Sequence, residues 1–218
     1  MPKSLKIVTW NANGLQNHIR ELQIFLLKEG IDICLISESH NTLQTYINVK
    51  GYRIYNAYHP LGIARGGVTV LVRENIKHNE HSKIESLQMQ VVTISVNINN
   101  KICNMSAIYC PPRYTPKAED FIDLFESLGP CFIIGGDFNA KNTYWGSRLT
   151  TTKGRNLLRA GRYKKCNFHS GNKPTYWPTD NQKISDLIDF YVSKGINKNH
   201  IFVQNCDDLS SDQSSVLM

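Results

Sequence analysis

Several features are missing from this sequence, and each absence narrows what the chain can be. Its six cysteines are scattered, with no Cys-x-x-Cys pair and no clustering with histidine, so the usual zinc-site spacings are excluded. Four of the six lie in apolar, strand-like runs, which predicts small buried thiols in a reducing compartment. No apolar run approaches the roughly 18 residues of a membrane-spanning helix, and no charged-then-apolar leader opens the chain. We therefore expect a soluble protein with no membrane partner and no signal for export.

Acidic residues are absent from the whole stretch between Phe138 and Thr179, which contains nine Lys or Arg residues. Because the net charge of the chain is +7, this one segment carries +9 and the remainder −2. Such a run is either an ordinary solvated basic face or a surface that binds the phosphates of a nucleic acid. The predicted phosphate-binding cations are Lys141, Arg148, Lys153, Arg155, Arg159 and Arg162.

Repeats, linkers and low-complexity tracts are likewise missing, and 218 residues that are 41% hydrophobic suit one domain with a sizeable core. Apolar β-branched runs and segments of helical periodicity alternate along the chain. The pattern predicts an α/β sandwich of two sheets with flanking helices, antiparallel in the middle of the chain. The expected strands are Leu5–Trp10, Ile31–Ile36, Tyr52–His59, Gly67–Arg73, Met89–Asn97, Ile102–Tyr109, Phe132–Ile134, Leu187–Val192, Ile201–Val203 and Val216–Met218, and the expected helices are Gln16–Lys28, Glu119–Leu128 and Gly154–Lys165.

The stretch from Cys131 to Asn142, CFIIGGDFNAKN, organises our interpretation of the chain. Phe132–Ile134 is a short apolar run bounded by glycines, which is typical of a buried strand. Asp137 and Asn139 follow it two residues apart, so in extended backbone their side chains point to the same face. Such a pair can orient a water and hold a phosphate oxygen, although Gly, Asp and Asn also build ordinary turns.

Polar residues recur at the ends of the other predicted strands. Residues that leave neighbouring strands at one edge of a layered sheet converge, so we expect these side chains to share one site. A cluster of Asp, Glu and Asn without cysteine or paired histidine favours a hard, oxygen-ligated ion such as Mg²⁺ or Mn²⁺. The set comprises Asn11, Glu38, Tyr109, Asp137 with Asn139, Asp189, and Ser211-Asp212.

Short motifs in this order resemble the endonuclease/exonuclease/phosphatase superfamily: TWNANG, ISES, IYCPP, GGDFNA, LIDF and LSSD. Three longer runs, PPRYTP, GGDFNAKNTYWGS and KPTYWPTDNQKISDLIDFYV, resemble the endonuclease domain of non-LTR (LINE-type) retrotransposons of the jockey type. The resemblance spans nearly all 218 residues. It implies a DNase I-like, four-layered α/β sandwich with two mixed, mainly antiparallel sheets. It also implies one domain over residues 1–218, in the N-terminal part of a longer polyprotein with a reverse transcriptase domain.

The resemblance also implies a role for each residue of the site. Asn11 and Glu38 would hold the metal, and Tyr109 would contact the scissile phosphate. Asp137 would deprotonate the attacking water, and Asn139 would fix the position of Asp137 and bind a phosphate oxygen. The remaining residues are Thr175 and Ser211, which would contact phosphate or DNA, Asp189, which normally pairs with a histidine, and Asp212, which precedes that histidine.

The implied reaction is hydrolysis of one strand of double-stranded chromosomal DNA, with Mg²⁺ or Mn²⁺ and no small-molecule cofactor. It would leave a 3′-hydroxyl as primer for reverse transcription, in the nucleus, after synthesis in the cytoplasm.

One position departs from the family pattern, because Gln213 stands where the family has histidine. A neutral amide can donate a hydrogen bond but cannot usefully accept or release a proton. Three interpretations stay open: a weakened endonuclease, a DNA-binding module without turnover, and another phosphoesterase of the superfamily such as an apurinic endonuclease. The uninterrupted basic segment argues against small soluble substrates.

Overall fold

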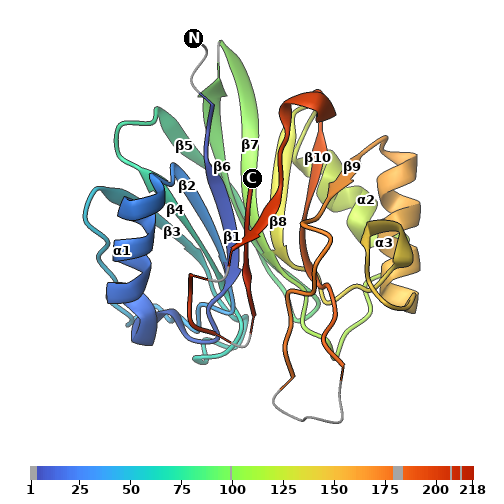
Figure 1. Cartoon of the computed structure of the whole chain (residues 1–218), viewed down its shortest axis with the longest axis horizontal. Helices are drawn as coiled ribbons and strands as arrows, with labels where there is room; N and C mark the ends of the chain where they lie inside the picture. The colour runs from blue at the N-terminus through green and yellow to red at the C-terminus, as the bar shows by residue number, and fades with distance from the viewer. Residues whose placement is uncertain (1–3, 99, 179–183, 207, 212) are drawn as a thin grey trace.

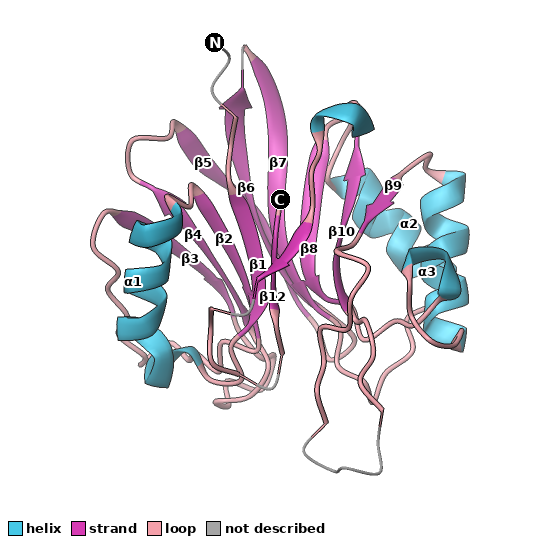
Figure 2. Cartoon of the chain, in the orientation of Figure 1, coloured by secondary structure: helices cyan, strands magenta, loops and turns pink. Residues whose placement is uncertain are grey.

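Two six-stranded β-sheets pack face to face in the computed structural model, and helices cover the outer face of each (Figures 1 and 2). The structure describes residues 4–98, 100–178, 184–206, 208–211 and 213–218. One sheet has the order β11-β12-β1-β2-β4-β3 and the other β5-β6-β7-β8-β10-β9. We call them sheet A and sheet B. The predicted four-layered α/β sandwich with mixed sheets is confirmed.

Sheet A contains the first and the last strand of the described chain. Its strands are β1 (Ile7–Asn11), β2 (Ile33–Ser37), β3 (Tyr52–Ala57), β4 (Val68–Arg73), β11 (Gln204–Cys206) and β12 (Ser215–Leu217). A short 3₁₀ helix, η1 (Leu15–His18), leads into α1 (Ile19–Glu29), which Gly30 ends in the left-handed conformation. The β1–β2 pair is parallel because α1 carries the chain back between these strands.

Sheet B contains the middle of the chain. Its strands are β5 (His78–Glu85), β6 (Gln90–Ile98), β7 (Lys101–Tyr109), β8 (Phe132–Asp137), β9 (Asn167–His169) and β10 (Asp189–Lys194). The parallel β7–β8 pair is joined through α2 (Ala118–Ser127), and α3 (Thr152–Tyr163) packs beside α2 on the same outer face. Two short 3₁₀ helices complete the chain, η2 (Thr143–Trp145) and η3 (Lys198–His200).

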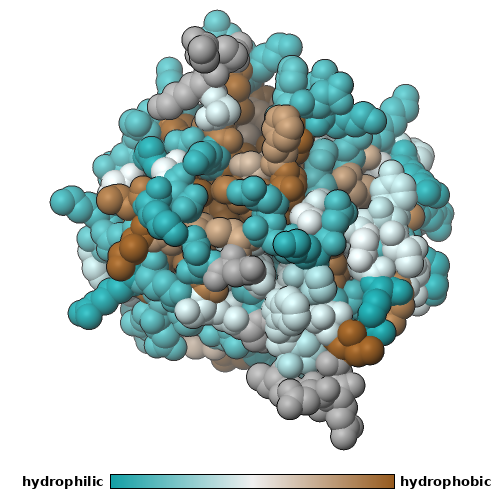
Figure 3. All heavy atoms as spheres, viewed as in Figure 1, coloured by the Kyte–Doolittle hydropathy of each residue, from teal (hydrophilic) through white to brown (hydrophobic). Residues whose placement is uncertain are grey.

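Three apolar clusters hold the four layers together. The cluster between the sheets includes Leu35, Ile94 and Tyr191, all fully buried. The other two clusters lie outside, one between sheet A and α1 and one between sheet B, α2 and α3. In the space-filling view, apolar atoms form a brown band between the two sheets, with hydrophilic side chains on either side (Figure 3). Burial of this apolar surface is the main favourable contribution to the fold.

The strand ends that carry the predicted site lie at one rim of the sandwich, the lower edge in Figure 1. Register pairs Asn11 with Ser37 in sheet A, and Asp137 with both Tyr109 and Asp189 in sheet B. Ser37 pins the two sheets together there, because its hydroxyl donates to the Ile108 carbonyl at 2.8 Å and accepts from the Asp137 N–H at 3.0 Å.

Gly136 makes this close approach of the sheets possible. Its φ is +147°, and a Cβ at this position would lie 2.1 Å from the Ile108 carbonyl oxygen and 2.8 Å from the Ser37 hydroxyl. A side chain would therefore push the rim open directly beside Asp137. This explains in physical terms why glycine precedes the carboxylate in the GGDFN stretch.

Most predicted elements are confirmed, with three corrections. The strand β5 was not predicted, because as a largely exposed edge strand with the sequence HNEHSKIE it lacks an apolar pattern. The short β9 was also missed. Residues 201–203 are not a strand, since the strand that pairs with β12 begins at Gln204. All six cysteines are free thiols, and no helix in the described ranges is long and apolar enough to cross a membrane.

Candidate active site

The Asn11 side chain lies between two carboxylates from different sheets. Its Nδ2 donates to Glu38 Oε1 at 2.9 Å and to Asp137 Oδ2 at 3.1 Å. Its Oδ1 accepts from the backbone N–H of Asn13 at 3.0 Å. Asn11 is fully buried at the end of β1, so its amide orientation is set by these partners. The sequence prediction that Asn11, Glu38 and Asp137 converge is confirmed.

Asn139 fixes the carboxylate of Asp137 from the turn that follows β8. Its backbone N–H donates to Asp137 Oδ1 at 2.7 Å and its Nδ2 donates to Oδ2 at 2.8 Å. Asn139 has a φ of +45°, and Glu38 one of +48°, so two residues of the site adopt the left-handed backbone conformation. That conformation is strained for residues other than glycine and is maintained by the surrounding contacts.

Gln213 joins Asp189 to Asn11 across the site. In the amide orientation that matches donors to acceptors, its nitrogen donates to Asp189 Oδ1 at 3.0 Å and Oδ2 at 2.6 Å, while its oxygen accepts from Asn11 Nδ2 at 2.9 Å. The expected proximity of Asp189 to residue 213 is thus confirmed. Ser211 holds the turn, because its hydroxyl accepts from Trp10 Nε1 at 3.1 Å and from the Gln213 N–H at 3.0 Å. Asp212, a predicted site residue, lies outside the described residues.

Tyr109 completes the side of the site next to Glu38. Its hydroxyl hydrogen-bonds to Glu38, and Nε2 of His40 lies 3.5 Å from Glu38 Oε2. His40 follows Glu38 by two residues and, like it, has a positive φ. The sequence analysis placed His40 in a loop and gave it no role. Only the turn geometry brings its ring to the carboxylate.

The pKa values of the two central carboxylates, Glu38 and Asp137, are shifted in opposite directions. Burial opposes ionisation of Glu38, but hydrogen bonds from His40, Asn11 and Tyr109 outweigh it, so the pKa of Glu38 is lowered. Burial and then the negative charge of Glu38 raise the pKa of Asp137 to about 7, against the hydrogen bonds from Asn139 and Asn11. Glu38 therefore stays ionised at neutral pH, whereas Asp137 can exchange a proton there.

The donor chemistry of the site fits a hydrated Mg²⁺ ion. In the described part of the chain, no three His, Cys, Asp or Glu side chains form a closed metal site. Mg²⁺ does not need one, because it keeps several waters and binds through one or two carboxylates together with substrate phosphates. Glu38, whose side chain is 22% exposed, supplies such an ionised carboxylate, and the charge repulsion felt by Asp137 favours a cation nearby. The nitrogen of Asn11 faces Glu38 in this conformation, so Asn11 could ligate a metal only after its amide turns.

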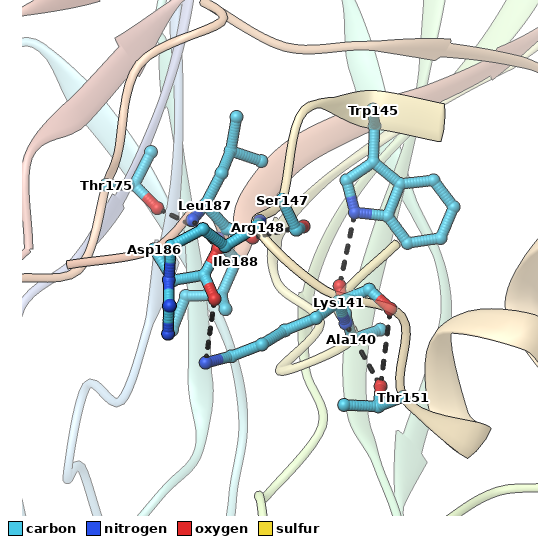
Figure 4. Close-up of polar contacts among 10 residues, drawn as sticks. All are labelled: Ala140, Lys141, Trp145, Ser147, Arg148, Thr151, Thr175, Asp186, Leu187 and Ile188. Atoms are coloured by element: carbon cyan, nitrogen blue, oxygen red, sulfur yellow. Dashed lines mark hydrogen bonds and ion pairs between the residues drawn. The ribbon is translucent and has the colours of Figure 1, made fainter. Parts of the chain in front are cut away.

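An ion pair fastens the loop after β8 to the segment that precedes β10 (Figure 4). Lys141 Nζ lies 3.0 Å from Asp186 Oδ2, and Asp186 Oδ1 accepts from the backbone N–H groups of Arg148 and Leu187, each at 2.9 Å. Ser147 donates its hydroxyl proton to the Leu187 carbonyl at 2.8 Å. Lys141 is therefore committed to the buried Asp186 carboxylate, and its predicted contact with phosphate would require this pair to open.

Thr175 supports the first residues of β10 in a similar way. Its hydroxyl oxygen accepts from the backbone N–H groups of Ile188 and Asp189, each at 3.1 Å, and the residue is fully buried. Its own N–H donates to the Asp186 carbonyl at 3.0 Å. Thr175 thus positions Asp189, and its hydroxyl does not face solvent as the predicted phosphate contact requires.

The predicted basic face is smaller than the sequence indicates. Lys153 is a correction: it is only 4% exposed, and its ammonium donates to the carbonyls of Pro111 at 2.8 Å and Cys110 at 3.4 Å. Burial lowers its pKa, partly offset by Cys110 and Asp137. Lys153 therefore holds the backbone that follows Tyr109 and offers no charge at the surface.

The four predicted arginines are exposed and differ in their neighbours. Arg148 lies in the loop between η2 and α3, and Arg155 lies near the start of α3, where its guanidinium donates to Thr152 at 3.0 Å. Arg159 lies 3.7 Å from Glu119, and Arg162 stacks over the Tyr144 ring at 5.5 Å. Along the helix axis these two lie about 6 Å and 10 Å beyond Arg155, so Arg155 is the nearest of the three to the start of α3.

Comparison with solved structures shows which known proteins share this fold. The endonuclease domain of TRAS1, a telomere-specific non-LTR retrotransposon, superposes with a TM-score of 0.79 at 18% identity, covering 98% of this chain and 97% of that one. The AP endonuclease LMAP from Leishmania major superposes with a TM-score of 0.75 at 12% identity, covering 98% and 86%. These superpositions show that the chain has the fold of the endonuclease/exonuclease/phosphatase class.

The sequence comparisons narrow this class to one family. Residues 103–216 match the family described as endonuclease-reverse transcriptase, and the chain belongs to that family. It is 32% identical over 214 residues to the RNA-directed DNA polymerase from mobile element jockey of Drosophila funebris, and 31% identical to that of Drosophila melanogaster. It covers only 23% of the length of each of these relatives. The predicted resemblance to jockey-like non-LTR retrotransposons is confirmed.

Proposed function

We propose that this chain is a metal-dependent DNA endonuclease domain. It would hydrolyse one phosphodiester in one strand of double-stranded target DNA and leave a 3′-hydroxyl. Because the chain spans about a quarter of the jockey relatives it matches, we further propose that a reverse transcriptase in the same polypeptide extends this end, in the nucleus. The supporting observation is the convergence of Glu38, Asp137 and Asp189 on the amides of Asn11 and Gln213.

In this proposal Asp137 is the general base. Burial raises the pKa of Asp137 above the usual range of a carboxyl group, which makes its carboxylate a stronger proton acceptor. Asn139 and Asn11 hold its carboxylate in one orientation, so a water that it binds is oriented as well. As this water attacks phosphorus, Asp137 takes its proton, the bond from phosphorus to the 3′-oxygen breaks, and the strand retains a 5′-phosphate and a free 3′-oxygen. That oxygen takes a proton from solvent.

Glu38 would hold the metal beside the Tyr109 hydroxyl. When bound, Mg²⁺ would supply positive charge to the phosphate and the leaving oxygen. Tyr109 is 7% exposed, and burial together with the nearby Glu38 and Asp137 charges raises its pKa. It therefore keeps its proton at neutral pH. Once a cation binds Glu38, this hydroxyl can donate to a phosphate oxygen.

Gln213 limits the rate in this mechanism. Its nitrogen is engaged with Asp189 and its oxygen with Asn11, so it offers no titratable proton to the phosphate. A missing positioned donor or proton-transfer group costs on the order of 10²–10⁴ in rate. This observation favours a second candidate function, a DNA-binding module that retains the fold but does not cut.

Nicking of supercoiled plasmid, with Mg²⁺ and with EDTA, distinguishes the two functions. The endonuclease proposal expects slow conversion to open circles in Mg²⁺, none in EDTA, and nicks that a DNA polymerase can extend. Asp137→Asn should abolish the conversion. Binding without nicking, unchanged by Asp137→Asn, would favour the binding module. Nicks that a polymerase cannot extend would contradict the proposed bond cleavage.

A further inference from the structure

The connection between β3 and β4, residues 58–67, lies at the same rim as the acidic site, on the sheet A side (Figure 1). Its last two residues are fastened to the segment that carries Glu38. The Gly66 carbonyl accepts from the His40 N–H at 2.8 Å, and the Gly67 carbonyl accepts from the Ser39 N–H at 3.2 Å. The Gly67 N–H donates to Gln90 Oε1 at 3.3 Å. The end of this loop therefore has a set position beside the site.

Gly66 lies against the ring of Tyr109. Its φ is +57°, and a Cβ there would lie 3.2 Å from Tyr109 Cε1 and 2.9 Å from Gln90 Oε1. Arg65 is the residue immediately before this contact, so its backbone is held at the edge of the Tyr109 ring. The loop also turns tightly just before it, because the Arg65 N–H donates to the Ile63 carbonyl at 2.8 Å.

The side chain of Arg65 is exposed beside the contact between Gly66 and the Tyr109 ring. Within the described residues, no carboxylate forms an ion pair with Arg65. Arg53, Arg73 and Arg159 differ, since each lies within ion-pair distance of a carboxylate.

Arg65 also lies on the opposite side of the site from the basic segment. Arg148 and Arg155 belong to the elements that follow β8 in sheet B, whereas Arg65 precedes β4 in sheet A. A DNA strand whose phosphate reaches Asp137 must continue across the rim in both directions. Arg148 and Arg155 lie on only one of these two sides.

We propose that Arg65 binds a backbone phosphate of the DNA on the sheet A side of the scissile bond. This inference rests on the proposed function. It adds a phosphate contact from a residue outside the basic segment between Phe138 and Thr179. A guanidinium can bind a phosphate through two parallel hydrogen bonds, which a lysine ammonium cannot reproduce. The contact would position the strand without reading its sequence.

The test compares Arg65→Ala and Arg65→Lys with the matched control Arg53→Ala. Arg53 is an exposed arginine at the other end of β3, away from the rim, beside Glu74. Binding of a labelled duplex is measured by fluorescence anisotropy in EDTA, so that no strand is cut, at several salt concentrations. Thermal melts of each variant confirm that it is folded.

Arg65→Ala should weaken binding roughly fivefold, as expected for one partly exposed charge-assisted contact. It should also reduce the slope of log affinity against log salt by about 0.9. Arg65→Lys should keep the slope and bind with intermediate affinity, and Arg53→Ala should match the wild type.

Equal affinity and slope for Arg65→Ala and the wild type would overturn the inference and leave the proposed function standing. An equal loss for Arg65→Ala and Arg53→Ala would also overturn it, because the effect would then be one of net charge. If the wild type binds no duplex at all in EDTA, the inference fails, and nicking of plasmid in Mg²⁺ decides separately whether the proposed function stands.

Discussion

The two sides of the candidate site hold similar side chains in different surroundings. On the sheet A side, Glu38 follows β2, is 22% exposed at its side chain and accepts hydrogen bonds from three neighbours. On the sheet B side, Asp137 ends β8 and is fully buried beside Asp189, which is 1% exposed. Both sides meet at the amide of Asn11.

This difference in burial separates two chemical roles. Glu38 keeps its charge because polar partners compensate its loss of water, so it suits a cation. The pKa of Asp137 rises to about 7 because burial and the charge of Glu38 are not fully compensated, so it suits proton transfer. One sheet thus provides the charged side of the site and the other provides the base.

The largest expected effect concerns the base. Asp137→Asn, made in a Gln213→His background, should lower the nicking rate by roughly 10²–10⁴-fold, because the attacking water loses its proton acceptor. Single-turnover nicking at saturating Mg²⁺ measures this. Raising the Mg²⁺ concentration should not restore the rate, since the metal-binding carboxylate is intact. Recovery at high Mg²⁺ would instead make Asp137 a metal ligand.

The next effect concerns residue 213. Gln213→His should raise nicking at neutral pH by at least roughly 10²-fold, about 2.7 kcal/mol of barrier, because Asp189 can orient a cationic imidazole toward the phosphate. Gln213→Asn, which shortens the amide without adding a titratable group, is the control and should gain nothing. A wild-type rate equal to that of the histidine variant would show that the amide of Gln213 is competent.

The charged side of the site can be tested without catalysis. Glu38→Gln should weaken Mn²⁺ binding by about tenfold or more, because the neutral amide cannot compensate the charge of the ion. Titration of the protein with Mn²⁺, followed by electron paramagnetic resonance, measures the affinity. Asp189→Asn is the comparison on the buried side and should change the affinity less. A greater loss in Asp189→Asn would place the ion in sheet B.

The smallest effect concerns the ion pair that anchors the sheet B side. Asp186→Asn should reduce the free energy of unfolding by about 1–3 kcal/mol, since Lys141 loses its partner. Burial opposes ionisation of Asp186, but its hydrogen bonds and Lys141 outweigh it, so its pKa is lowered on folding. The ionised form therefore adds stability above the unfolded value of about 3.9, and this is lost as pH falls through the lower folded pKa.

Urea unfolding at several pH values tests this prediction. The difference between wild type and Asp186→Asn should be constant near neutral pH and shrink in acid. Asp208→Asn is a matched control, because its ion pair with Lys28 is exposed and such pairs contribute about 0–1 kcal/mol. A difference that grows in acid would contradict the sign of the shift.

Local sequence patterns were sufficient to predict much of the fold and the residue types of the site. The alternation of apolar runs with turn residues predicted most strands, and the glycine at residue 30 predicted the end of α1. Strand ends also predicted that Asn11, Glu38 and Asp137 would meet. The strand β5 escaped because an exposed edge strand has no buried face to create an apolar pattern.

Among the sequence features, charge was the least reliable for predicting which residues lie at the surface of the site. From the sequence, Lys141 and Lys153 are indistinguishable from Arg148 and Arg155, since all four occur in one acid-free segment. In the structure, Lys141 pairs with a buried carboxylate and Lys153 donates to buried carbonyls, whereas both arginines are exposed. Arg65 shows the reverse case, a cation outside the segment whose neighbour in the chain, Gly66, lies against the Tyr109 ring.

The sequence by itself therefore determined which residue types the site contains and the strand ends from which they come, because strand periodicity and glycine positions are local properties. Only the tertiary structure decided what each group does. Burial, hydrogen-bond partners and neighbouring charges set whether a carboxylate keeps its charge, as for Glu38, or exchanges a proton, as for Asp137. Burial and hydrogen bonding at one residue depend on residues far away in the sequence; Ser37 and Asp137, for example, are 100 positions apart and are joined by a hydrogen bond between the two sheets. A carboxylate is removed from water only once the layers of the fold have packed.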